Sequence, residues 1–255
     1  MMGVDDIAEL KNLSREQLET MAEAADQILE CYRLLGKSGE NIVAEVLRGE
    51  GEFFEWDHYP KGDVYDHVTH AQYYYHAHPA GLRGDEHGHF HTFLRPKGMP
   101  KGIRPKDLAD AEPARDANDA LSHLVAISMN SAGFPDRLFT TNRWVTAETW
   151  YDAADVIAMI DHFVIDLARP SLPVNIWITA MMRLFRLRIE RLLHQRDAAV
   201  AEHLAKHPGE NVYEDRNLEV TSMAEISVED QVRGVRKALS AARRRGSGAP
   251  RKNRR

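Results

Sequence analysis

Apolar residues follow a helical spacing in the first part of the chain. Ser14 and Gln17 have the spacing of a capping box, and apolar residues three and four positions apart follow them up to Gly36, which is expected to end the helix. Ser38 can cap a shorter second helix. The pattern therefore predicts a helical hairpin over residues 14–49.

The middle of the chain has a strand-like pattern. Aromatic and β-branched segments alternate with turn residues, which is typical of strands joined by turns. Gly133 and Pro135 favour a hairpin at the last of these turns. We expect one antiparallel sheet over residues 52–145, with strands at Phe53–Tyr59, His70–His78, His87–Arg95, Ser122–Asn130 and Asp136–Val145.

Two stretches between these strands are expected to be irregular. Residues 60–63 contain Pro60 and Gly62 and predict a turn. The segment Lys97–Ala120 is rich in Pro, Lys and Asp, which indicates an exposed loop with a short helix around Pro105–Ala111.

Helical spacing returns after Val145. Thr146 can cap a helix over Ala147–Ala168, and a longer apolar stripe predicts a second helix over Pro173–Lys206. A strand at Asn217–Met223 and a last helix that ends near Leu239 complete the helical region 147–239. Strands and helices come in blocks and do not alternate, so we predict a single α+β domain over residues 1–240. Its antiparallel sheet is flanked by the N-terminal helical hairpin and the long C-terminal helices.

Composition and charge limit the class of protein. The chain has 255 residues with an ordinary hydrophobic fraction of 43%, and a single cysteine excludes an internal disulfide. The N-terminus lacks the pattern of a secretory signal, and the most apolar stretch, 174–187, is interrupted by Arg183 and Arg186. A cytoplasmic protein without membrane contact is expected, and its oligomeric state is left open.

The charge is unevenly distributed. The net charge is −6, yet residues 241–255 carry seven basic residues and no acidic one. The acidic body would repel nucleic acid, so at most a weak contact through this basic tail is expected, and the tail itself is predicted to be disordered.

Histidines concentrate between Tyr73 and Pro96. Alternate residues of a strand share a face, so His87, His89 and His91 are expected on one face of their strand. The same holds for a histidine pair on the preceding strand, and another histidine opens the following strand. The candidate metal ligands are therefore His76, His78, His87, His89, His91 and His123.

Strand geometry restricts how the triplet can bind an ion. His87 and His91 are about 13 Å apart along a regular strand, so one ion takes the whole triplet only if the strand bulges, and Gly88 is the candidate bulge. We expect His89 and one neighbour to bind together with His76 or His78 from across the sheet. The remaining histidines would support these ligands or bind a second ion.

The histidine pattern favours a metal-dependent enzyme, either oxygenase-like or hydrolase-like, that acts on a small molecule. Neutral imidazoles suit Fe, Zn or Cu, and few protein ligands leave open positions for catalysis. Glu86, His89 and Arg143 are the candidate catalytic residues. Glu86 reaches the histidine face only if the strand bulges, and Arg143 could approach an anionic substrate.

Two alternatives remain open. His87, His89 and His91 form an H-x-H-x-H pattern that is similar to that of the histidine-triad nucleotide hydrolases and transferases. That resemblance implies metal-independent chemistry with His89 as the nucleophile, although Gly88 occupies a normally apolar position and the upstream signature is missing. The second alternative is a non-enzymatic metal carrier or interaction module.

The motifs YYYHAHP, EHGHFHTFLRP and LFTTNRWVTAETW together resemble a family of uncharacterised bacterial proteins classed as a domain of unknown function. The resemblance spans most of Glu52–Asp197. It implies one coherent domain and no particular catalytic residue.

Overall fold

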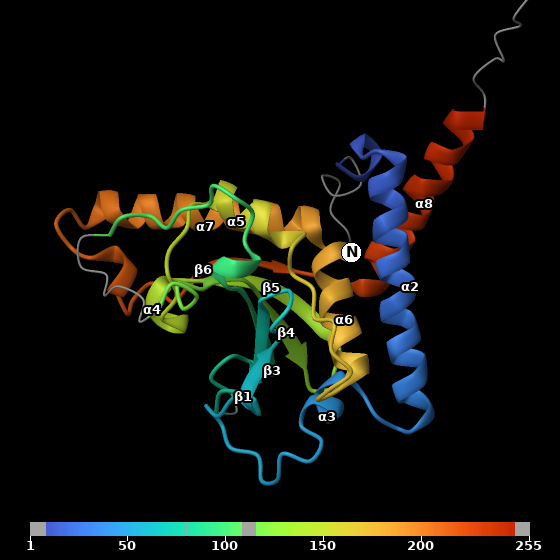
Figure 1. Ribbon diagram of the computed structural model, residues 1–255, viewed down its shortest axis with the longest axis horizontal. Coiled ribbons are helices and arrows are strands. Elements are labelled where there is room, and N and C mark those ends of the chain that lie inside the picture. The colour runs from blue at the N-terminus through green and yellow to red at the C-terminus, as the bar shows by residue number, and fades with distance from the viewer. Residues whose placement is uncertain (1–8, 80, 109–115, 248–255) are drawn as a thin grey trace, which may run out of the picture.

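A six-stranded antiparallel sheet forms the centre of the protein, and its strands lie in the order in which they occur along the chain. The computed structural model describes residues 9–79, 81–108 and 116–247 (Figure 1). The predicted α+β class is confirmed. The strands are β1 (Tyr59–Tyr65), β2 (Ala71–His76), β3 (Glu86–Leu94), β4 (Ser122–Asn130), β5 (Pro135–Thr141) and β6 (Val220–Glu225).

Helices precede and follow the sheet. The predicted capping box begins α2, with the Gln17 backbone N–H donating to Ser14 Oγ at 3.1 Å. The helices are α2 (Arg15–Lys37), α3 (Ile42–Val46), α4 (Arg143–Thr146), α5 (Ala153–Ile160), α6 (Leu172–Leu184), α7 (Arg186–Lys206) and α8 (Val228–Ser247), with short 3-10 turns η1 (Pro96–Gly98) and η2 (Val212–Glu214). In this described part of the chain, none of the helices is long and apolar enough to cross a membrane.

Helices cover one face of the sheet. The ring of Trp177 on α6 packs on Phe90 of β3 with 5.3 Å between the ring centroids, and Tyr73 OH on β2 donates to Asn175 Oδ1 at 2.7 Å. α2 lies on the outer side of α6 (Figure 1). There Trp177 Nε1 of α6 donates to Tyr32 OH of α2 at 3.1 Å. Because side chains alternate along a strand, the residues on either side of Phe90 point to the opposite face. His89 and His91 therefore lie on the face away from α6.

The first strand differs from the prediction. Residues 53–58 form a loop, and β1 begins at Tyr59 and continues through the predicted turn at 60–63. Gly62 and Asp63 have positive φ angles of 85° and 60°, and the pairing of β1 with β2 shifts register between Tyr59 and Val64. The turn residues thus make an irregularity within one strand, and the expected strand at Phe53–Tyr59 is wrong.

The helices between β5 and β6 also differ from the prediction. β5 ends at Thr141, and the expected helix over 147–168 is reduced to α5, because Ala147 is left-handed at φ 51° and the chain runs without helix as far as Asp152. The expected helix over 173–206 is two helices, which meet at Phe185. Residues 105–108 are not helical, and the rest of the short helix expected there lies outside the described residues.

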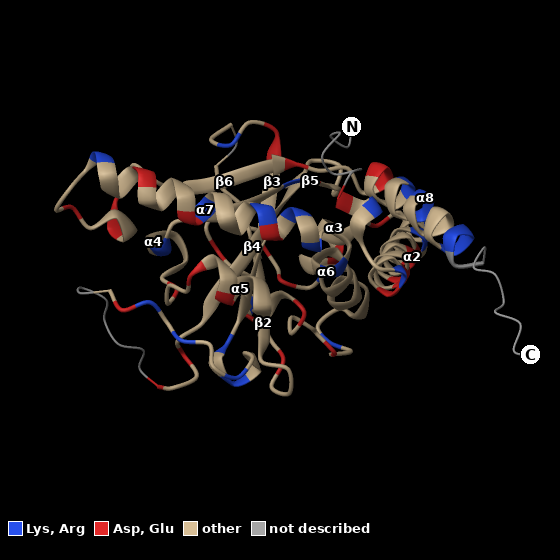
Figure 2. Cartoon of the chain, turned by 90° about the horizontal axis from the view of Figure 1, so that it is seen from above, with Lys and Arg blue, Asp and Glu red and all other residues tan. Residues whose placement is uncertain are grey.

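The last helix is longer than predicted. α8 extends to Ser247, so the prediction of disorder is wrong for residues 241–247, and residues 248–255 lie outside the described residues. Basic residues gather toward the C-terminal end of α8 (Figure 2). Some of them face acidic residues of α2, as in the ion pairs of Arg236 with Asp26 at 2.7 Å and of Arg243 with Glu19 at 3.2 Å.

Candidate metal centre

β2 and β3 are hydrogen-bonded neighbours, and their register places histidines directly across from each other. His76 of β2 pairs with His89 of β3, and Tyr74 pairs with His91. Residues paired in this way point to the same face of an antiparallel sheet. The histidine faces of the two strands therefore coincide, as expected from the alternation.

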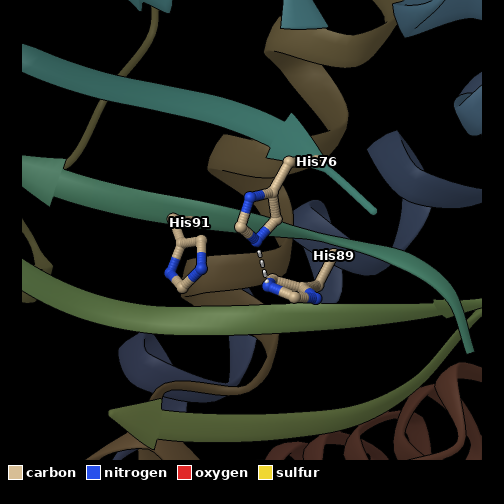
Figure 3. Close-up of side chains that lie close together, drawn as sticks. All are labelled: His76, His89 and His91. Carbon is tan, nitrogen blue, oxygen red and sulfur yellow. Dashed lines mark hydrogen bonds between the residues drawn. The ribbon is translucent and has the colours of Figure 1, made fainter. Parts of the chain in front are cut away.

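Three histidines converge on this face (Figure 3). His76 Nε2 lies 2.7 Å from His89 Nε2, and the ring of His91 lies beside both. One ring nitrogen from each of His76, His89 and His91 lies within 4.8 Å of the others. His89 and His91 are each 1% exposed, and His76, at the end of β2, is half-buried.

A β-bulge in β3 decides which of the neighbouring residues join the group. Glu86 pairs with Asn130 and Gly88 pairs with Met129, so β3 contains one extra residue, His87. The bulge turns Glu86 onto the histidine face, where Glu86 Oε1 lies 2.8 Å from His89 Nδ1. His87, one of the candidate ligands, lies apart from this group, because its Nδ1 lies 2.6 Å from Tyr75 OH, on the side of the sheet that faces the helices.

Gly88 is needed for this bulge. A Cβ atom at this position would lie 2.5 Å from the backbone oxygen of His76 and 2.5 Å from Tyr75 OH. Both distances are far below van der Waals contact, so only glycine lets β3 approach β2 this closely.

A second irregularity brings His123 to the group. β3 and β4 shift register between Thr92 and Phe93, so that Phe93 pairs with His123 and Leu124 is the extra residue on β4. With regular alternation His123 would point toward the helices. In the structure its Nε2 lies 3.0 Å from His91 Nδ1, so it supports His91 from behind and is not one of the three converging rings.

The remaining predicted residues occupy different places. The ring of His78 stacks on that of His89, with 5.2 Å between centroids, and lies against Trp56. His78 is therefore beside the three rings but outside the converging set. Arg143, on α4, forms an ion pair with Glu214.

Burial keeps the three converging rings neutral. Loss of water around the ring, together with the neighbouring His89, lowers the pKa of His76 to about 2. Burial likewise holds the pKa values of His89 and His91 well below the usual range. Neutral imidazole is the form that binds a metal ion.

The donor set fits a metal ion. His89 Nδ1 faces a carboxylate oxygen, which can only accept, so Nδ1 carries the proton and Nε2 presents a lone pair toward His76. His91 Nε2 is buried and has no hydrogen-bond partner in the described part of the chain. A carboxylate behind a ligating imidazole is a common arrangement in metal sites because it fixes the ring and its tautomer.

One buried acid near the centre was not found from the sequence. Glu148 accepts a hydrogen bond from the backbone N–H of His123 at 2.7 Å, and burial raises its pKa to about 8. It follows the left-handed Ala147, in a segment whose pattern predicted the first turn of a helix. The sequence held no sign that this acid would be buried.

Comparison with known proteins supports the resemblance seen in the motifs. No curated protein and no solved structure matches the chain. A family model does match, over residues 22–226, which include all six strands. The chain therefore belongs to the family described as a domain of unknown function, DUF6969.

Proposed function

We propose that the protein binds a transition-metal ion through His76, His89 and His91 and acts as a metal-dependent enzyme on a small molecule. The observation that carries the proposal is the convergence of three neutral imidazoles within 4.8 Å, with His91 Nε2 buried and lacking a partner among the described residues. Buried polar atoms nearly always have a partner, so this nitrogen is better explained by an ion than by packing.

The pair of His76 and His89 needs only a small adjustment to hold an ion. Two nitrogens bound to one tetrahedral ion at about 2.0–2.1 Å are about 3.4 Å apart, whereas the Nε2 atoms of His76 and His89 are 2.7 Å apart. His76 lies at the end of its strand and is half-buried, so its ring can rotate outward by this amount. Three imidazoles without a thiolate suit Zn, Fe or Cu.

The number of ligands favours catalysis over a structural role. Structural zinc sites have four protein ligands, whereas catalytic sites have three and leave a position open. A bound ion would supply Lewis-acid activation of water or of a substrate. In this arrangement His89 is a ligand, and Glu86 orients the ring of His89.

The histidine-triad alternative agrees less well with the geometry. That chemistry needs the three alternate histidines on one face, and the bulge turns His87 to the other face. His89 would be the nucleophile in that chemistry, yet one of its ring nitrogens contacts Glu86 and the other contacts His76. We therefore favour the metal-dependent function.

Metal content tests the proposal. Untagged protein is expected to hold about one ion per chain, and His76→Ala and His89→Ala are expected to lose it. His194→Ala serves as the control because His194 is an exposed histidine on α7. Elemental analysis provides the measurement, and a metal content that is unchanged in His89→Ala and His76→Ala would refute the metal centre.

A second measurement separates an enzyme from a carrier. Co²⁺ reports its coordination through its visible absorption, so Co²⁺-loaded protein is titrated with azide. A change of spectrum indicates an exchangeable position, as a catalytic centre needs. A spectrum that does not respond indicates a closed coordination sphere, and the carrier function would then replace the enzymatic one.

A further inference from the structure

Four residues form a straight row across the histidine face of the sheet. His76 on β2 pairs with His89 on β3, His89 pairs with Ser128 on β4, and Ser128 pairs with Arg137 on β5. Directly paired residues point to the same face, and neighbouring strands are about 4.8 Å apart. Arg137 is thus two strands from His89, with roughly 10 Å between their backbones.

The two residues beyond His89 have polar atoms that the fold does not use. Ser128 is fully buried, and its hydroxyl has no hydrogen-bond partner within the described residues. Arg137 Nη2 is also buried and has no hydrogen bond there. The acidic oxygens of Glu86 and Asp85 are 3.8 Å and 3.9 Å from Nη2, which is too far for a hydrogen bond, whereas Nε of the same guanidinium donates to Asp136 Oδ1 at 3.4 Å.

The unused groups are donors, although the guanidinium of Arg137 also has acidic neighbours in Asp85, Glu86 and Asp136. A guanidinium has no acceptor atom, and a serine hydroxyl can donate. A second guanidinium, that of Arg83, is paired with Glu219 and lies over the ring of Phe139, with 5.3 Å from its central carbon to the ring centroid. Phe139 in turn contacts the ring of His89 at 5.1 Å between centroids. An acceptor oxygen, such as that of an oxyanion, satisfies the unpartnered donors of Ser128 and Arg137, and a second cation does not.

We propose that the ligand of this site is a small acid whose oxyanion group, a carboxylate or a phosphoryl group, is held by Arg137 and Ser128 while its other end lies at the three histidines. The inference rests on the proposed metal centre and adds the chemical class of the substrate. Arg137 binds substrate in this scheme, in place of Arg143, the arginine expected from the sequence, because Arg137 lies in the row that contains His89.

Three probes of related structure test the inference on Co²⁺-loaded full-length protein. Succinate and 3-phosphonopropionate each carry a second acidic group that propionate lacks. Calorimetry measures their binding, and the absorption of Co²⁺ shows whether they reach the metal. Both diacids are expected to bind at least ~10-fold more tightly than propionate, as a hydrogen bond to a charged group allows. The tighter of the two identifies the oxyanion as carboxylate or phosphoryl.

Variants of Arg137 test whether this residue causes the tighter binding of the diacids. Arg137→Gln is expected to remove the preference for diacids and to leave the metal content unchanged. Arg137→Lys keeps the charge and should retain part of the preference, which also separates loss of binding from loss of folding. Arg33→Gln is the control because Arg33 is an exposed arginine on α2. The inference is overturned if the unchanged protein shows no preference for diacids, or if Arg137→Gln keeps it.

The experiment distinguishes the two proposals. If the protein takes up no Co²⁺, the metal centre fails, yet calorimetry still reads the binding of succinate directly. If succinate binds to the metal-free protein and this binding depends on Arg137, the anion site is supported. Normal uptake of Co²⁺ without any effect of Arg137→Gln would keep the metal centre and reject the anion site.

Discussion

Glu86 shows how a single side chain can set the chemistry of a histidine. Its carboxylate accepts from Nδ1 of His89 and leaves Nε2 as the atom that faces His76. Without the carboxylate the ring could rotate and exchange its proton between the two nitrogens. Glu86 therefore belongs to the site although it is not one of the converging residues.

Replacing Glu86 tests this role. Glu86→Ala is expected to weaken Zn²⁺ binding by about 10- to 100-fold, because His89 loses the partner that orients it. Competition with a chromophoric chelator measures the affinity. Asp85→Ala is the matched control, since Asp85 is the adjacent acid and its side chain is 86% exposed. Equal affinities of the two variants would show that the carboxylate has no such role.

At the scale of elements, the sequence predicted regular alternation well and irregularities poorly. The prediction for β4 was correct, and β3 differs by one residue at each end. From alternation alone His76 and His89 could be expected on facing positions, as they are. Gly88 and His123 were named from the sequence as a candidate bulge and a candidate ligand, but how a bulge redirects side chains depends on the neighbouring strands, so the departure of His87 could not be predicted.

Dependence on neighbouring elements also explains why some strands and helices were predicted wrongly. Gly62 and Asp63 have the composition of a turn, yet in this structure they form an irregularity within β1. Residues after Thr146 have a helical pattern, but Ala147 takes a left-handed conformation and Glu148 reaches the backbone of His123. Tertiary contacts override local preference in both places.

The bulge in β3 gives a prediction at this scale. Gly88→Ala is expected to destabilise the protein by about 1–3 kcal/mol, because the new methyl group would meet the backbone of His76 and the hydroxyl of Tyr75. Urea unfolding measures the loss. Gly36→Ala on α2 is the control, since a Cβ atom there meets nothing within 4 Å. A loss of stability no larger than that of the control would mean that β2 and β3 can move apart without destabilising the protein.

At the scale of the whole molecule, Glu148 links stability to pH. Its pKa is raised from 4.5 to about 8, chiefly by burial. The unfolded chain therefore ionises at a lower pH than the folded protein. The stability associated with the protonated carboxyl is complete below about pH 4.5 and is lost as the pH rises through about 8.

A neutral replacement should remove this dependence. Glu148→Gln keeps an oxygen for the N–H of His123 and has no charge to bury. The variant is expected to be more stable than the unchanged protein at pH 9, by on the order of a few kcal/mol, and to show little gain at pH 5. Urea unfolding at the two pH values measures this, with Glu23→Gln as an exposed control. A gain of equal size at both values would contradict the link to ionisation.

The row from His76 to Arg137 also determines the length of ligand that the site can hold. Its members belong to different strands of one hydrogen-bonded sheet, and the distance between strands is nearly constant at about 4.8 Å. For a ligand held at both ends, the spacing of the strands then determines how many atoms lie between its reacting group and its acidic group. Relatives that carry the arginine one strand nearer or farther would select shorter or longer acids without any change in the metal ligands.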